Sequence, residues 1–131
     1  YDYDENLIYA SPLVGSYSVQ LTPTGHFDAA LVFSYPGSIQ NPKLILKGVN
    51  TNTEYGRCEV VGTSTGFKFS SLYSDSYITD NAGNSLLNGV SPGYSPFFRM
   101  PLSEPCTLTL TAASSLTETS KASVYYFYRS V

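Results

Sequence analysis

The sequence has little charge, and its charged residues form no basic surface. Charged side chains make up 13% of the 131 residues, about half the share found in an average globular protein. Seven basic and ten acidic residues give a formal net charge of −3. Three of the acids, Asp2, Asp4 and Glu5, lie at the start, which leaves seven acids against seven basic residues. Nucleic acids and anionic membranes are bound by clustered positive charge, so we expect neither as a partner.

Tryptophan and long apolar runs are also absent. No stretch approaches the roughly 20 apolar residues of a membrane-spanning helix, and these 131 residues contain no n-region and h-region of a signal peptide. The chain begins at Tyr1 without a methionine. We therefore expect a part of a longer protein, with a processed chain as the alternative.

Metal-binding motifs are missing. The only histidine, His26, stands in a Thr- and Gly-rich turn without a neighbouring carboxylate, so we expect an exposed side chain. Two cysteines and one histidine cannot complete a four-ligand zinc site without a carboxylate, and neither C-x-x-C nor H-x-x-x-H occurs. We predict no metal and no cofactor. Cys58 and Cys106 occupy apolar strand positions, which indicates buried free thiols, with a disulfide as the alternative if their strands are neighbours.

Acidic residues offer only weak candidates for catalysis. A glycosidase needs two carboxylates a few ångströms apart. Asp75 and Asp80 flank one predicted strand, while Glu54 and Glu59 border another. Acids at strand ends usually form turns or face water, and neither G-x-S-x-G nor a glycine-rich phosphate loop is present. We expect no enzymatic activity, and the sequence DNAGN at 80–84 favours a hairpin turn over a calcium site.

The residues that are present favour β-structure. Two stretches alternate with the period of a strand: PCTLTLTA at 105–112 and ASVYYFYRSV at 122–131. In the first, Cys106, Leu108 and Leu110 share one face and threonines occupy the other. Both faces of the second stretch are bulky, which predicts a strand in the interior of a sheet.

Shorter strand signals fill the rest of the chain, with turn residues roughly every ten positions. Further strands are expected at 16–21, 27–36, 43–48, 57–62, 66–70, 74–79 and, as a short piece, 97–100. The Pro36–Gly37 pair should end the second of these strands, and residues 63–66 should form a turn. The pattern predicts an all-β, antiparallel, jelly-roll-like β-sandwich of about nine short strands. Residues 1–15 are expected to be a linker or edge segment, and residues 16–131 a single domain.

Tyrosine is the abundant residue type with recognition chemistry. The chain has 12 Tyr and 7 Phe. Tyrosine rings can stack on sugar faces while their hydroxyl groups bond to sugar hydroxyls. Candidate carbohydrate-binding residues, all in or near predicted loops, are Tyr55, Tyr73, Tyr77 and Tyr94. Packing at the edge of the core is the competing role for each of them.

Five segments occur in a particular order: NPKLILKG, YGRCEV, SYITD, SPFFRMPLSEP and a Tyr-rich final strand that ends in Arg-Ser-Val. In this order they resemble the carboxyl-terminal domain of the distal tail proteins of siphophages and prophages of Gram-positive bacteria. The similarity runs from about Phe27 to the carboxyl terminus, and none of the segments is a catalytic signature.

The resemblance implies a structural role at the tail tip of a virion. Such proteins form a ring, typically a hexamer, from which a carboxyl-terminal galectin-like β-sandwich projects. The implied function is assembly contact with other tail-tip proteins, together with host attachment. The full-length protein is expected to be hexameric, and this domain alone monomeric. The alternative function is a carbohydrate-binding module for host cell-wall polysaccharide, and a secreted glycan-active enzyme is a third interpretation.

Overall fold

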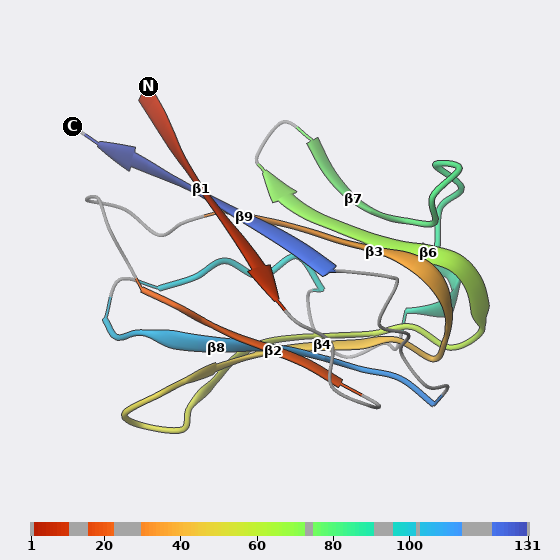
Figure 1. Ribbon diagram of the computed structural model, residues 1–131, viewed down its shortest axis with the longest axis horizontal. Helices are drawn as coiled ribbons and strands as arrows, with labels where there is room; N and C mark the ends of the chain where they lie inside the picture. Colours follow the sequence, from red (N-terminus) through yellow and green to blue (C-terminus); the bar gives the residue numbers. More distant parts are fainter. Residues whose placement is uncertain are drawn as a thin grey trace.

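The computed structural model describes residues 2–10, 16–22, 30–72, 75–90, 96–101, 103–113 and 122–130 (Figure 1). These ranges contain nine strands and one short 3-10 helix. The elements are β1 (Asp2–Ala10), β2 (Ser16–Leu21), β3 (Ala30–Gln40), β4 (Lys43–Gly48), β5 (Glu54–Glu59), β6 (Thr63–Leu72), β7 (Asp75–Thr79), η1 (Leu87–Gly89), β8 (Cys106–Thr111) and β9 (Ala122–Ser130). None of the helical structure in these ranges is long and apolar enough to cross a bilayer.

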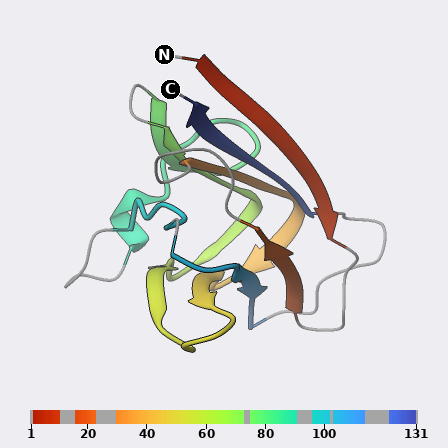
Figure 2. The ribbon, with the colours of Figure 1, turned by 90° about the vertical axis from the view of Figure 1, so that its left-hand side faces the viewer.

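The strands form two sheets. A five-stranded sheet has the order β1-β9-β3-β6-β7, and a four-stranded sheet has the order β2-β8-β4-β5. Every pairing between these strands is antiparallel. Figures 1 and 2 show the two sheets as the layers of a sandwich. The predicted all-β antiparallel fold is therefore confirmed, and β9 is the interior strand that its bulky faces predicted.

Alternation along the strands turns one face of each sheet toward a shared core. In β8, Cys106, Leu108 and Leu110 are buried while the threonines between them are half-buried, as predicted. In the other sheet, Phe67 and Phe69 of β6 are fully buried. Burying one large apolar side chain stabilises the fold by about 1.5–3 kcal/mol relative to leaving it exposed, so this core is the main source of stability.

β3 continues through Pro36 and Gly37, so the prediction that this pair ends the strand is wrong. The register with β6 shifts between Tyr35 and Ser38, which places the proline in an irregularity of the bulge type. Proline has no backbone N–H group, and at a bulge the pairing between strands does not need one. The Pro36 carbonyl also accepts a hydrogen bond from Nδ2 of Asn81 at 2.7 Å. The strand therefore resumes beyond the bulge.

The turn predicted at residues 63–66 is also wrong, because these residues begin β6. Thr63, Ser64 and Thr65 pair with the part of β3 that follows the bulge. The chain turns just before them, where Gly62 has a φ of 128°, a value that glycine adopts most readily. The bulge in β3 thus gives β6 three more residues to pair with.

Residues 97–100 form no strand, in contrast to the prediction. Phe98 and Met100 are instead buried against the sandwich. The Phe98 ring stacks on Phe69 with 4.8 Å between ring centroids. Phe98 also lies directly over Gly56, where a β-carbon would overlap its side chain. The segment therefore covers part of the core as a loop.

The first described residues belong to the sheet. β1 pairs with β9 along its whole length, from Asp2 opposite Ser130 to Ala10 opposite Ala122. Residues 2–10 of the predicted linker or edge segment thus form an outermost strand. Residues 11–15 lie outside the described ranges, and the division of the chain after residue 15 stays a prediction.

Candidate functional site

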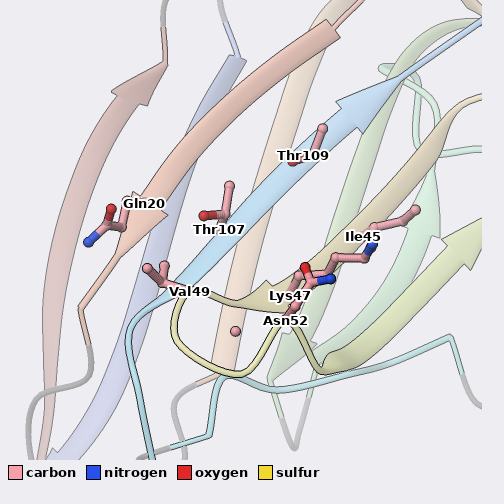
Figure 3. Close-up of a pocket in the computed structure, with 8 residues that line it drawn as sticks. Gln20, Ile45, Lys47, Val49, Asn52, Thr107 and Thr109 are labelled. Atoms are coloured by element: carbon pink, nitrogen blue, oxygen red, sulfur yellow. The ribbon is translucent and has the colours of Figure 1, made fainter.

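A groove lies on the outer face of the four-stranded sheet (Figure 3). Its volume is about 410 Å³, which falls within the range of roughly 300–1,000 Å³ that is usual for small-molecule sites. Three strands and one loop supply its lining, which consists of Gln20 from β2, Thr107 and Thr109 from β8, Ile45, Lys47 and Gly48 from β4, and Val49 and Asn52 from the loop after β4.

Strand register explains why these side chains meet. Ile45 and Lys47 of β4, and Thr107 and Thr109 of β8, alternate with the buried leucines of the same strands. Thr107 is paired with Gln20 on one side and with Lys47 on the other, so three side chains form a row across three strands. Thr109 and Ile45 are paired in the next row. The result is a surface of hydroxyl, amide and ammonium groups with the aliphatic side chains of Ile45 and Val49 among them.

Glu104 anchors the loop between β4 and β5 from the inside. Glu104 is buried, with only 5% of its surface exposed. Oε1 accepts hydrogen bonds from the backbone N–H groups of Asn50 and Thr51, at 2.8 and 3.0 Å. Oε2 accepts hydrogen bonds from the hydroxyl groups of Thr51 and Tyr55, both at 2.5 Å. Gly48 leaves the room for this arrangement, because a β-carbon there would overlap the carboxyl group.

These hydrogen bonds keep Glu104 ionised. The side chains of Thr51 and Tyr55 lower its pKa from 4.5 to about 2, against the opposing effect of burial. A carboxylate that accepts several hydrogen bonds is stabilised in its charged form. Its four hydrogen bonds are all made within the protein, so Glu104 acts as a loop anchor and not as an acid or base.

Backbone hydrogen bonds hold the same loop where it borders the groove. Val49 N–H donates to the Pro105 carbonyl at 2.9 Å, and Gly48 N–H donates to the Thr53 carbonyl at 2.8 Å. Asn52 N–H donates to the Gly48 carbonyl at 3.1 Å, and Asn52 has a φ of 58°. Asn tolerates this left-handed conformation better than most residues. The two loop residues that line the groove, Val49 and Asn52, therefore have fixed positions.

Glu54 and Glu59, one of the carboxylate pairs considered for catalysis, both bind Arg57. Nη2 of Arg57 lies 2.5 Å from Glu54 Oε1, and Nη1 lies 2.7 Å from Glu59 Oε1. Lys43 Nζ lies 3.3 Å from the same Glu59 oxygen. The hydrogen bond with Arg57 lowers the pKa of Glu54. A general acid needs a raised pKa, so this network is suited to an ion-paired surface and not to glycoside cleavage.

Two of the four candidate tyrosines, Tyr55 and Tyr77, lie within the described residues, and they occupy different sites. Tyr55 is half-buried, packs against the core and donates its hydroxyl hydrogen bond to Glu104. Its ring therefore supports the loop. Tyr77 lines a second, open hollow. Tyr73 and Tyr94 lie outside the described residues, as does His26.

The second hollow lies on the other sheet, beside the turn that follows β7. Its volume is about 420 Å³. Lys68 of β6, Tyr77 and Thr79 of β7, and the turn residues 80–83 line it. The pKa of Tyr77 is raised, mainly by burial and to a smaller extent by the nearby charge of Asp75. The phenol is therefore protonated at neutral pH and available as a hydrogen-bond donor.

The turn at 80–84 is formed as predicted. Oδ1 of Asp80 accepts hydrogen bonds from the backbone N–H groups of Ala82 and Asn84, both at 2.9 Å. Asn84 lowers the pKa of Asp80 through two hydrogen bonds, and the bond from its side chain has a larger effect than the bond from its backbone. The described residues contain no group of three His, Cys, Asp or Glu side chains that could hold a metal ion. Asp80 thus serves the turn.

Both cysteines are free and buried, as predicted. Cys58 lies on β5 and Cys106 on β8, and β4 runs between these two strands. The pKa of the Cys58 thiol is raised to about 12 and that of the Cys106 thiol to about 11, mainly because both thiols are buried. Thiols that stay protonated are poor nucleophiles, so neither cysteine suits covalent catalysis.

Sequence reasoning missed the groove because its residues come from distant parts of the chain. The alternating threonines of 105–112 did signal a polar outer face. Their partners Gln20 and Lys47 could be found only from the strand order. Glu104 was missed because it stands in a Pro-rich segment that reads as an irregular loop.

Comparison with known proteins leaves the chain without an assigned family. No protein-family model matches it, and no curated protein matches it. Among solved structures there is a likeness to the cryo-EM structure of the virus-like particle of extra small virus from the giant freshwater prawn Macrobrachium rosenbergii. The sequences are 10% identical, the likeness covers 98% of this chain and 81% of the other, and the TM-score is 0.27. At this TM-score the likeness carries no conclusion about shared fold or function.

Proposed function

We propose that the chain is a peripheral β-sandwich module of a phage tail-tip (distal tail) protein and acts through non-covalent assembly contacts. The ordered segments that resemble this family support the proposal, and the two-sheet fold agrees with the domain type that the resemblance implies. Of the carboxylates considered for catalysis, Asp80 holds a turn, and Glu54 and Glu59 form ion pairs with Arg57. A binding role fits these observations better than a catalytic role.

An exposed apolar patch carries the proposal of assembly contacts. Val61 is 70% exposed and Leu87 is 46% exposed. Their segments lie side by side, because Val61 N–H donates to the Gly89 carbonyl at 2.8 Å and Val60 forms a bridge with Val90. Two exposed aliphatic side chains on adjoining segments offer a candidate contact point for a protein partner. We define Val61 and Leu87 as the apolar patch.

Immunogold electron microscopy would test the location. Antibodies raised against the chain should label particles at the tail tip. Label on the head, or none on intact particles, would contradict the proposal. The contact itself can be measured by binding of the purified chain to purified tail-tip proteins.

The double variant V61S/L87S should weaken that binding by about tenfold, because a few buried side chains dominate most interfaces. The variant A113S, which changes an exposed residue outside the patch, is the matched control. Equal binding by both variants would remove the apolar patch from the interface, and circular dichroism would check that both remain folded.

Carbohydrate binding is the second candidate function, and Tyr77 is the observation that favours it. This tyrosine lines the open hollow beside the turn after β7, together with a lysine, a threonine and amide and carboxylate groups. Tyr77→Ala should abolish binding to purified cell-wall polysaccharide, whereas Tyr77→Phe should retain the ring and most of the affinity. Undiminished binding by the alanine variant would exclude this hollow as a sugar site.

A further inference from the structure

Among the described residues that line the groove on the four-stranded sheet, Lys47 is the one that carries a charge. Lys47 is exposed and forms no hydrogen bond or ion pair with any other residue in the described ranges. Glu54, which is opposite Lys47 on β5, binds Arg57. Lys47 also lowers the pKa of Glu54, but by less than Arg57 does. A ligand in the groove therefore meets a positive charge, although the chain as a whole carries −3.

None of the described residues that line the groove is a carboxylate, and Glu54, the cross-strand partner of Lys47, is bound to Arg57. Glu104 lies behind the loop and uses both carboxylate oxygens to hold Asn50, Thr51 and Tyr55. The remaining polar lining is neutral: the amides of Gln20 and Asn52 and the hydroxyls of the two threonines. Neutral donors and acceptors around one cation suit a ligand that has many hydroxyl groups and one acidic group.

The backbone beneath the groove is not available to a ligand. β8 is paired with β2 and β4, and β4 is paired with β8 and β5. An extended peptide commonly binds by adding a strand to a free sheet edge; of the three strands that line the groove, only β2, which supplies Gln20 alone, is at an edge of the sheet. Recognition in the groove therefore depends on side chains, which favours a saccharide over an acidic peptide.

The shape of the groove is set before a ligand arrives. The Glu104 anchor and the backbone hydrogen bonds of Val49 and Asn52 fix the loop that borders it. Ile45 and Val49 add aliphatic surface that can contact the C–H face of a sugar ring. A fixed site avoids part of the entropy cost of binding.

From these observations we propose that the groove binds an acidic saccharide, with Lys47 contacting the carboxylate or other acidic group and the Gln20, Asn52 and threonine side chains contacting sugar hydroxyls. The groove is distinct from both the apolar patch and the Tyr77 hollow. The inference does not depend on the tail-tip assignment, since it rests on the groove alone.

The test is calorimetric titration of the purified chain with an oligogalacturonic acid and with its carboxyl-reduced, neutral counterpart of the same length. We expect saturable binding of the acidic oligosaccharide, weakened by added salt, and much weaker binding of the neutral one. Lys47→Gln should lower the affinity by about tenfold, or about 1.4 kcal/mol, because it removes the charged hydrogen-bond donor. Lys43→Gln is the matched control, because Lys43 lies on the same strand, pairs with Glu59 and does not line the groove.

Several results would overturn the proposal. Equal affinity for the acidic and neutral oligosaccharides would remove the role of charge, and equal losses in the two lysine variants would make the attraction non-specific. Absence of binding to both sugars would also overturn it. A glutamate-rich peptide that bound more tightly than the acidic sugar, with loss on Lys47→Gln, would assign the groove to a protein partner. Both substituted side chains are on the protein surface, and unchanged melting temperatures would confirm that the variants are folded.

Discussion

At the residue scale, Glu104 shows how one ionised side chain can organise a loop. Its two carboxylate oxygens accept four hydrogen bonds from three residues between 50 and 55. The sequence around it, PLSEP, gives no sign of this, because it has neither strand periodicity nor a motif. The anchoring depends on a contact between residues about 50 positions apart, which a local pattern cannot reveal.

This arrangement predicts a specific pH dependence for Glu104→Gln. The pKa of Glu104 is lowered in the folded state to about 2 from 4.5, so its carboxylate stabilises the fold above about pH 4.5. That stabilisation is lost as the pH falls toward 2. The variant should therefore unfold at lower urea concentration than the wild type at pH 6, and the gap should shrink progressively between pH 4.5 and pH 2.

Urea titrations monitored by circular dichroism would measure this difference. Tyr55→Phe provides a graded comparison, because it removes one of the four donors and should shift the loss of stability to higher pH. A constant gap between wild type and Glu104→Gln at every pH would contradict the anchoring role of the charge.

At the scale of the elements, local patterns predicted best where a strand alternates without interruption. The alternation in β8 correctly predicted both its buried face and its polar face. Residues 27–36 were less informative, because Pro36–Gly37 normally breaks a strand. Here a bulge accommodates the proline and a side-chain amide satisfies its carbonyl. The bulge depends on the partner strand, so the sequence of β3 alone could not reveal it.

The groove was unpredictable for a related reason. The polar face of β8 could be read from its own residues, whereas the row from Gln20 through Thr107 to Lys47 depends on the order β2-β8-β4. These three positions are spread across nearly 90 residues of the chain. Strand propensity defines which residues share a face, and long-range pairing decides which faces meet.

The loop that covers the core gives a second prediction, for Phe98→Ala. Phe98 is 6% exposed and stacks on Phe69 above Gly56. Truncating a buried phenylalanine typically costs about 3–5 kcal/mol of unfolding free energy, and we expect a loss of that size from chemical denaturation. Phe97→Ala is the control, because Phe97 is only partly buried and should cost less. Equal losses would show that Phe98 has no special part in closing the core.

At the scale of the whole molecule, the reactivity of the two free thiols measures how often the fold opens. Both cysteines are buried in the core on strands that are paired within the four-stranded sheet. Their raised pKa values also keep them protonated and slow to react. We predict that the folded chain reacts slowly with Ellman's reagent, at a rate that depends on unfolding.

In denaturant without reductant, the same reagent should detect two thiols per chain. Fewer than two would indicate that Cys58 and Cys106 are bridged in the purified protein. Rapid labelling under native conditions would contradict their burial. Cys106→Ser, which leaves one thiol, identifies which site reacts first.

The pairing of β1 with β9 also determines how the fold can be joined to other chains. Asp2 and Ser130 are direct partners in the register, and both ends of the ribbon lie at the same corner in Figure 1. Polypeptide entering and leaving the sandwich therefore does so at neighbouring points. Such a fold can be inserted into a loop of a larger protein, or opened and rejoined as a circular permutant, without stretching either connection. A single corner would then serve as the attachment, with the groove and the apolar patch both carried on the body beyond it.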